Sequence, residues 1–322
     1  MNVASDFDAA ETLLEQVRDA LASDTALRIQ GSNSKAFLGR ESAGEILDTR
    51  SHRGIVSYDP TELVISARAG TPLAELHATL DAAGQMLPCE PPSFGTGATL
   101  GGMLASGLSG PRRPWAGAVR DFVLGTRVIS GSGQHLRFGG EVMKNVAGYD
   151  LSRLMAGSYG CLGLVTEVSL KVLPKPRQCL SLSLEMDRQR ALVQLAEWGQ
   201  QPLPISAACH DGDRLHLRLE GGEGSVAAAH DRLGGEPLAP GYWSQLNEQQ
   251  LDFFNPGLPL WRLSVPHNTP LLPLPGEQLL DWGGAQRWLK TDATAADIRA
   301  VVSAVGGHAS CYSQGLLDSP FQ

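Results

Sequence analysis

The chain has 322 residues, of which 42% are hydrophobic and 19% charged, and its 26 basic and 34 acidic residues give a net charge of −8. This length suits two domains, and the composition is that of a globular protein that buries a sizeable core. The acidic balance, without a basic block, argues against nucleic acid or an anionic membrane as the main partner. Five cysteines without a C-x-x-C pair predict reduced thiols. With no signal peptide and no long apolar run, the expected location is cytoplasmic.

The first half of the chain mixes helices with short strands. Helices are expected at residues 7–21 and 71–83, the second capped by Thr71 with Pro72 at its first position. The β-branched segments between turn residues predict strands at 26–30, 45–50, 54–59, 62–70, 121–130, 134–139 and 162–174.

The proline-containing segment at residues 174–178 is the best predicted boundary. The pattern restarts beyond it, with strands alternating with helices up to residue 307. The sequence therefore predicts an α+β fold with a first domain at residues 1–176 and a second at residues 177–322.

A glycine-rich stretch, PPSFGTGATLGGMLASGLSG at residues 91–110, raises the question of a nucleotide site. The dinucleotide fingerprint of a Rossmann fold needs a buried strand before its glycines and a long helix after them. Here two prolines precede the glycines, and further glycines interrupt the segment that follows. A nicotinamide site is therefore not expected.

A second polar loop, GSNSK at residues 31–35, follows the strand at 26–30. Small residues let backbone N–H groups approach an anionic pyrophosphate closely. Each loop alone is adequately explained as a tight turn. Two such loops about sixty residues apart suit one large elongated ligand better than a single phosphate.

A third segment, MKNVAGYDLSRLMAGSYGCLGLVTEV at residues 143–168, completes a pattern with the two loops and with RDFVLG at 120–125. In this order the four elements resemble the flavoprotein oxidases and dehydrogenases of the vanillyl-alcohol-oxidase (PCMH) type. Within that superfamily, RIQGSNSKAFLG, PLWRLSVP and DWGGAQRWL are most similar to the E-type FAD-binding subunits of glycolate oxidase, also called glycolate dehydrogenase.

The resemblance implies a PCMH-type domain, in which two α+β subdomains sandwich FAD, followed by an α+β cap domain. It implies FAD contacts from the polar loop at residues 31–35, from the glycine-rich loop at 91–110 and from the strand that contains Val165. The implied cofactor-binding residues are Gly31, Ser32, Asn33, Ser34, Lys35, Pro92, Gly95, Gly101, Gly102, Ser106, Gly107 and Val165. Because residues 29–39 contain no histidine, the FAD is expected to be bound non-covalently.

Two segments imitate other signatures of the superfamily. HDGDRLH at residues 210–216 resembles the H-x-G-D-G-N-x-H signature of active 2-hydroxy acid dehydrogenases, but it is one residue short and lacks the asparagine, so a β-hairpin is the preferred reading. FFNPG at 253–257 imitates a C-terminal family tail, here by coincidence. The chain ends without that tail, whose absence is expected to weaken FAD binding.

Candidate substrate-binding residues are Arg262 and Arg287, because arginine binds carboxylates through two parallel hydrogen bonds. The alternative is that both are structural, with Trp282 and Trp288 packing beside the second. No catalytic acid or base can be named, and no metal site is expected.

The resemblance implies an FAD-binding subunit of a multi-subunit glycolate oxidase that converts glycolate to glyoxylate. The implied partners are a D-type sister FAD subunit and an iron–sulfur subunit that passes electrons to a quinone-type acceptor, with any membrane association only through these partners. The alternatives are a stand-alone FAD-dependent 2-hydroxy acid dehydrogenase and a non-catalytic scaffold subunit.

Overall fold

The structure is a computed structural model that describes residues 7–40, 42–140, 149–317 and 319–322. The chain divides into two compact units, each described separately below. Unit 1 comprises Met1–Ala36, Glu41–Gly110 and Gly117–Lys175. Unit 2 comprises Phe37–Arg40, Pro111–Ala116 and Pro176–Gln322, so two short segments from the first half of the sequence belong to it.

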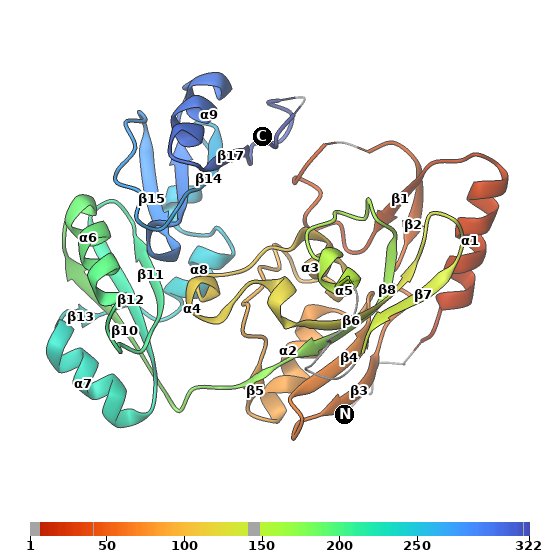
Figure 1. Ribbon diagram of the computed structural model, residues 1–322, viewed down its shortest axis with the longest axis horizontal. Helices are drawn as coiled ribbons and strands as arrows, with labels where there is room; N and C mark the ends of the chain where they lie inside the picture. Colours follow the sequence, from red (N-terminus) through yellow and green to blue (C-terminus); the bar gives the residue numbers. More distant parts are fainter. Residues whose placement is uncertain (1–6, 41, 141–148, 318) are drawn as a thin grey trace. The chain divides into compact units, whose positions relative to one another are not determined.

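Unit 1 combines short helices with three small sheets (Figure 1). Its helices are α1 (Ala10–Ala22), α2 (Leu73–Ala82), α3 (Leu100–Ser106), α5 (Leu151–Leu154) and the 3-10 helix at Val119–Phe122. Its strands are β1 (Leu27–Gln30), β2 (Glu45–Asp48), β3 (Ile55–Asp59), β4 (Val64–Arg68), β5 (Gln85–Met86), β6 (Val123–Ile129), β7 (His135–Gly139), β8 (Leu164–Lys171) and β9 (Leu173–Pro174).

The largest sheet of unit 1 has the strand order β3-β4-β8-β6-β7, and every neighbouring pair in it is antiparallel. Strands β1 and β2 form a separate parallel pair. The apolar face of α1, with Leu13, Leu14 and Val17, packs on Leu47 of β2 and Ile129 of β6. This burial fixes β1 and the loop that follows it relative to the rest of unit 1.

Thr71 does not cap α2, contrary to the sequence prediction. The N-cap is Pro72, which makes no side-chain cap, and Thr71 Oγ1 instead accepts from Gly54 N at 2.9 Å and donates to Gly54 O at 3.2 Å. Thr71 is fully buried, so its hydroxyl satisfies the backbone of a neighbouring turn that has no access to water.

Unit 2 contains one mixed-order antiparallel sheet with helices packed on it. Its helices are α4 (Arg113–Ala116), α6 (Arg188–Trp198), α7 (Glu223–Leu233), α8 (Tyr242–Asn247), α9 (Ala295–Ala304) and 3-10 helices at Asp252–Phe254 and Trp282–Gly284. Its strands are β10 (Gln178–Glu185), β11 (Ile205–His210), β12 (Arg214–Gly221), β13 (Glu236–Pro237), β14 (Leu260–Ser264), β15 (Glu277–Asp281), β16 (Gln286–Lys290) and β17 (His308–Cys311).

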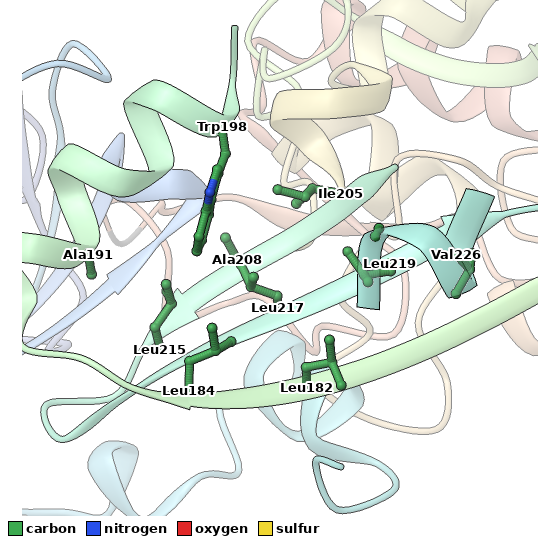
Figure 2. Packing of buried hydrophobic residues seen from close by; sticks show 11 residues of the cluster. Leu182, Leu184, Ala191, Trp198, Ile205, Ala208, Leu215, Leu217, Leu219 and Val226 are labelled. Atoms are coloured by element: carbon green, nitrogen blue, oxygen red, sulfur yellow. The ribbon is translucent and has the colours of Figure 1, made fainter. Parts of the chain in front are cut away.

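The eight strands of unit 2 follow the order β13-β10-β12-β11-β15-β16-β14-β17, and a single residue pair, His210 with Leu280, joins β11 to β15. Each half of this sheet has its own apolar cluster. Figure 2 shows the first, in which Trp198 of α6 points toward Ala208 of β11 and Leu215 of β12. The second cluster gathers on Trp261 of β14 beneath α9.

A buried ion pair holds the segment Pro111–Ala116 within unit 2. Arg112 NH2 donates to Glu220 Oε1 at 2.8 Å, and a second guanidinium nitrogen contacts the other carboxylate oxygen. Both side chains are about nine-tenths buried. Although burial alone would raise the pKa of Glu220, the charges of Arg218 and Arg112 and the hydrogen bonds from Arg112 and Ser206 hold it below its usual value.

Candidate functional site

The two loops singled out in the sequence lie against each other in unit 1. Ser34 Oγ donates to the carbonyl of Ser93 at 2.8 Å, and Lys35 Nζ donates to the same carbonyl at 3.2 Å. A Cβ added to Gly31 would lie 2.5 Å from Thr99 Oγ1, so the backbone of the first loop touches the residue that caps α3. The folding of the chain thus brings residues 31–35 and 91–99 into one place.

The backbone amides of these loops are available to a ligand. Among the hydrogen bonds within the described residues, none is donated by the N–H groups of residues 31–34 or 95–97. Asn33 has a left-handed backbone with φ of 64°, a conformation that turns successive amides in a common direction. These two runs of amides, which donate to no acceptor among the described residues, form a cradle suited to an anion with several oxygens.

Helix α3 extends this cradle. Thr99 Oγ1 accepts from Gly102 N at 3.2 Å and starts the helix, which ends at Gly107 with φ of 62°. At this end the helix meets the segment after α5, because Gly157 N donates to Leu104 O and Tyr159 N to Ala105 O, each at 2.9 Å. A Cβ on Gly107 would lie 2.9 Å from the Cα and N of Gly157, so only glycine allows this approach.

The segment after α5 returns to β1 and closes a ring of chain segments. A Cβ on Gly160 would lie 3.2 Å from Cδ1 of Ile29, two residues before the first loop. Ile29 and Tyr159 expose 38% and 42% of their surface here. Ser158 Oγ, next to Tyr159 in sequence, is buried and has no hydrogen-bond partner among the described residues.

These features fit FAD as the ligand of this cradle. The unpaired amides offer donors to the pyrophosphate, and the exposed apolar side chains offer surfaces to its two ring systems. The orphaned hydroxyl of Ser158 offers a further donor, and a buried polar group without a partner is rare unless a ligand or water completes it.

The predicted cofactor residues occupy three kinds of position. The members of the first loop and Gly95 line the cradle, while Gly101 and Gly102 lie in the first turn of α3 and Gly107 at its end. Three others are buried behind this surface. Pro92 is buried next to Ser93, Ser106 Oγ donates to Met103 O at 3.1 Å within its own helix, and Val165 lies in β8 opposite Val128.

Several residues of the cradle were not assigned from the sequence. Ile29, Ser93, Thr99, Ser158 and Tyr159 belong to it through long-range contacts. Ser158 and Tyr159 carried a signal, since both stand within the G-S-Y-G motif. The K-N-V-A-G part of the third motif, residues 144–148, lies outside the described residues.

The hairpin interpretation of residues 210–216 is confirmed, since β11 and β12 pair around Asp211–Asp213. His216 Nε2 and Asp211 Oδ2 are 2.7 Å apart, and His210 Nε2 donates to Met186 O at 2.7 Å. Although burial acts in the opposite direction, the hydrogen bonds from His216 and from two backbone amides hold the pKa of Asp211 well below its usual value. Both histidines are buried, and among the described residues no cluster of His, Cys, Asp and Glu forms a metal site.

Arg287 is excluded from the substrate site, which corrects the sequence prediction. Its side chain is fully buried, Nε donates to Gly284 O at 3.0 Å and NH1 to Pro270 O at 2.7 Å, and NH2 donates to Thr269 O. Burial lowers its pKa to about 10. The guanidinium therefore holds the chain around residues 269–284 and offers nothing to a ligand.

Arg262 differs from Arg287 because the register of β14 and β16 places them on opposite faces of the sheet. Arg262 pairs with Trp288 and Arg287 with Leu263, and side chains alternate along each strand. Arg262 Nε donates to Gln286 Oε1 at 2.5 Å, and its guanidinium carbon lies 5.1 Å from the centroid of the Trp282 ring.

Comparison with known proteins decides the family. The model of an FAD binding domain matches residues 7–139. Glycolate oxidase subunit GlcE of Escherichia coli (strain K12) is 62% identical over 308 residues, which is 96% of this chain and 88% of that protein. The chain belongs to the GlcE family of FAD-binding glycolate oxidase subunits.

More distant relatives of this GlcE-family chain match less than half of it. Glycolate oxidase subunit GlcD of Bacillus subtilis (strain 168) is 35% identical over 41% of this chain and 28% of its own length. D-lactate dehydrogenase of Anaerostipes hadrus is 34% identical over 43% of this chain and 29% of its own length. A solved structure of alkyldihydroxyacetonephosphate synthase superimposes with a TM-score of 0.69 at 16% identity, covering 94% of this chain and 71% of that one, which establishes the PCMH-type fold.

The part of the chain that the structure describes holds no helix that is long and apolar enough to cross a membrane.

Proposed function

We propose that this chain is an FAD-binding subunit of a multi-subunit glycolate oxidase that oxidises glycolate to glyoxylate. The observation that carries the proposal is the pair of loops at residues 31–35 and 91–99, whose unpaired amides meet in one cradle in a chain of the GlcE family. The more distant relatives include GlcD and D-lactate dehydrogenase, oxidoreductases by name, which supports chemistry on a CH–OH group.

In this proposal the two loops hold the pyrophosphate of FAD. The amides of residues 31–34 and 95–97 would donate to its oxygens, and the Lys35 ammonium, kept in place by the Ser93 carbonyl, would add a positive charge nearby. Gly101, Gly102 and Gly107 let α3 pack closely on Ala69, Thr99 and Gly157, and Pro92, Ser106 and Val165 would support the site from buried positions. Binding is non-covalent, because the first loop offers no histidine.

Bound FAD supplies the acceptor for the hydride that leaves the α-carbon of a 2-hydroxy acid. The chain's own contribution is to orient the cofactor and to exclude water from it. Both histidines of the 210–216 hairpin are buried and hydrogen-bonded to Met186 or Asp211, which favours a structural role for them.

The buried histidines favour a division of labour within a complex. We infer that a D-type sister subunit carries out the principal oxidation, and that the FAD of this chain relays electrons or stabilises the assembly. An iron–sulfur subunit then passes electrons to a quinone-type acceptor, and the complex meets the membrane through such partners. The alternatives, a self-sufficient 2-hydroxy acid dehydrogenase and a scaffold without cofactor, predict different spectra.

The test is the visible spectrum of the full chain purified alone, before and after anaerobic addition of glycolate. A flavin band that persists supports the relay role, whereas a band that bleaches supports a self-sufficient dehydrogenase. A chain that stays colourless after incubation with FAD refutes the cradle.

A matched pair of variants links the spectrum to the cradle. In Gly31→Ala the new methyl group would meet Thr99 Oγ1 at 2.5 Å, whereas in Gly131→Ala nothing lies within 4 Å. The first variant is expected to lose most of its bound FAD, measured as the ratio of absorbance at the flavin band to that of protein. The second is expected to keep it.

A further inference from the structure

Trp282 of unit 2 is held in an unusual backbone conformation. Its φ is 54°, and Gly283 and Gly284 follow with φ of 65° and 96°, so three successive residues are left-handed. A bulky aromatic residue rarely adopts this region, and such strained positions concentrate at functional sites. The indole is only 4% exposed, so the conformation serves to place its ring inside unit 2.

Two guanidinium groups lie on this indole. The Cζ atom of Arg113, in the segment Pro111–Ala116, is 4.4 Å from the ring centroid, and that of Arg262 is 5.1 Å from it. The negative face of an indole attracts cations and lets two of them approach one ring. The arrangement concentrates positive charge from two distant parts of the sequence around one side chain.

A chain of hydrogen bonds orients Arg262. Asp281 Oδ2 accepts from Gln286 Nε2 at 3.0 Å, which requires the amide oxygen of Gln286 to face the other way. That oxygen accepts from Arg262 Nε at 2.5 Å. Both Asp281 and Gln286 are buried, so the guanidinium of Arg262 is held at its Nε side.

Two further arginines of unit 2 that pack on tryptophans, Arg218 and Arg299, are bonded differently from Arg262. Arg218, over Trp243, donates through Nε to Ser206 Oγ at 2.9 Å and lies beside Glu220. Arg299, over Trp261, donates through NH2 to the carbonyl of Ser319 at 2.7 Å.

Within the described residues, the terminal nitrogens of Arg262 donate to no protein acceptor. A pre-oriented guanidinium whose two terminal nitrogens are open offers parallel N–H groups at the spacing of a carboxylate.

We propose that Arg262 binds the carboxylate of a small 2-hydroxy acid through NH1 and NH2, with Trp282 as its platform and Arg113 as the second positive charge. Gln286 and Asp281 are positioning residues, because they act on the ligand only through Arg262. The choice of ligand rests on the proposed function, whereas the site itself rests on unit 2 alone.

The experiment is calorimetric titration of the full chain with oxamate, a two-carbon carboxylate that has no C–H bond to oxidise. The wild-type chain is expected to bind oxamate, and Arg262→Gln to bind it at least tenfold more weakly. Arg262→Lys keeps the charge but loses the paired N–H groups, so it is expected to fall between the two. Arg299→Gln is the matched control, since it removes another arginine stacked on a tryptophan and should leave the affinity within twofold of wild type.

The outcomes separate this site from the proposed function. No binding of oxamate to the wild-type chain, or equal binding by Arg262→Gln, overturns the site whatever the flavin spectrum shows. Selective loss in Arg262→Gln, with far-ultraviolet circular dichroism unchanged, supports the site even if the chain fails to bind FAD. A chain that binds FAD but not oxamate keeps the proposed cofactor role and loses this substrate site.

Discussion

The contact between Gly107 and Gly157 gives the sharpest test of the cradle. A methyl group at residue 107 would lie 2.9 Å from both Cα and N of Gly157, atoms that move only with the backbone. Gly84, just after α2, provides a matched control, because its φ of 66° is close to the 62° of Gly107 but nothing lies within 4 Å of its added Cβ. The two alanine variants therefore share the conformational cost and differ in the collision.

The magnitudes follow from these two terms. A left-handed alanine costs about 1–2 kcal/mol relative to glycine. The reduced entropy of the unfolded chain offsets about 0.4–1 kcal/mol of this. Gly84→Ala should therefore lower the free energy of unfolding by about 1 kcal/mol or less. Overpacking adds about 1–3 kcal/mol, so Gly107→Ala should lower it by about 2–4 kcal/mol.

The assay is urea unfolding followed by circular dichroism, together with the amount of FAD retained after gel filtration. Gly107→Ala should lose FAD, because a displaced Gly157 carries Ser158 and Tyr159 away from the cradle. Gly84→Ala should retain FAD at the wild-type level. Equal unfolding free energies for the two variants, or full retention of FAD by Gly107→Ala, would show that α3 does not depend on this approach.

Three further predictions concern single side chains and pH. Ser158→Ala should weaken FAD binding about tenfold, because one hydrogen bond to a charged group is lost. The unfolding free energy of the FAD-free chain should stay within about 0.5 kcal/mol of the wild-type value. An unchanged FAD dissociation constant would contradict this prediction. Glu220→Gln breaks a buried ion pair and should lower the unfolding free energy by about 3 kcal/mol. Its control, Glu236→Gln, lies in an exposed ion pair and should change the unfolding free energy by less than about 1 kcal/mol. Similar losses in the two variants would refute the different weight given to the buried and the exposed pair. Burial lowers the pKa values of His52 and His210 from 6.5. As pH falls through about 6.5, the unfolded chain therefore binds protons more readily at these two residues than the folded chain does. The unfolding free energy measured at pH 5.5 should be lower than that at pH 7.

Helices, strands and turns could be predicted from the sequence because each depends mainly on the order of neighbouring residues. The hairpin at residues 205–221 follows from alternating residues around Asp-Gly-Asp, and the structure places its strands there. The glycine-rich motifs predicted a cradle because small residues permit the backbone approaches now observed at Gly31 and Gly107.

Long-range pairing was beyond such patterns. Arg262 and Arg287 looked equivalent in sequence. The register of β14 with β16 places them on opposite faces of the sheet, and the guanidinium of Arg287 is hydrogen-bonded to backbone carbonyls. Threonine is a common helix N-cap, but the hydroxyl of Thr71 is hydrogen-bonded to Gly54 in a turn 17 residues earlier in the sequence. The sequence did not predict the contact of Arg113 with Trp282, because the two residues are about 170 positions apart.

The ion pair between Arg112 and Glu220 also bears on how the protein is made. Its two residues are 108 positions apart, so a growing chain exposes Arg112 long before its carboxylate exists. The segments Phe37–Arg40 and Pro111–Ala116 must wait for residues beyond Pro176 before unit 2 can take them up. The segment Pro111–Ala116 therefore reaches its place in unit 2 only after Glu220 has been made, and residues 176–322 expressed alone would keep Arg218 but lack Arg112 beside Glu220.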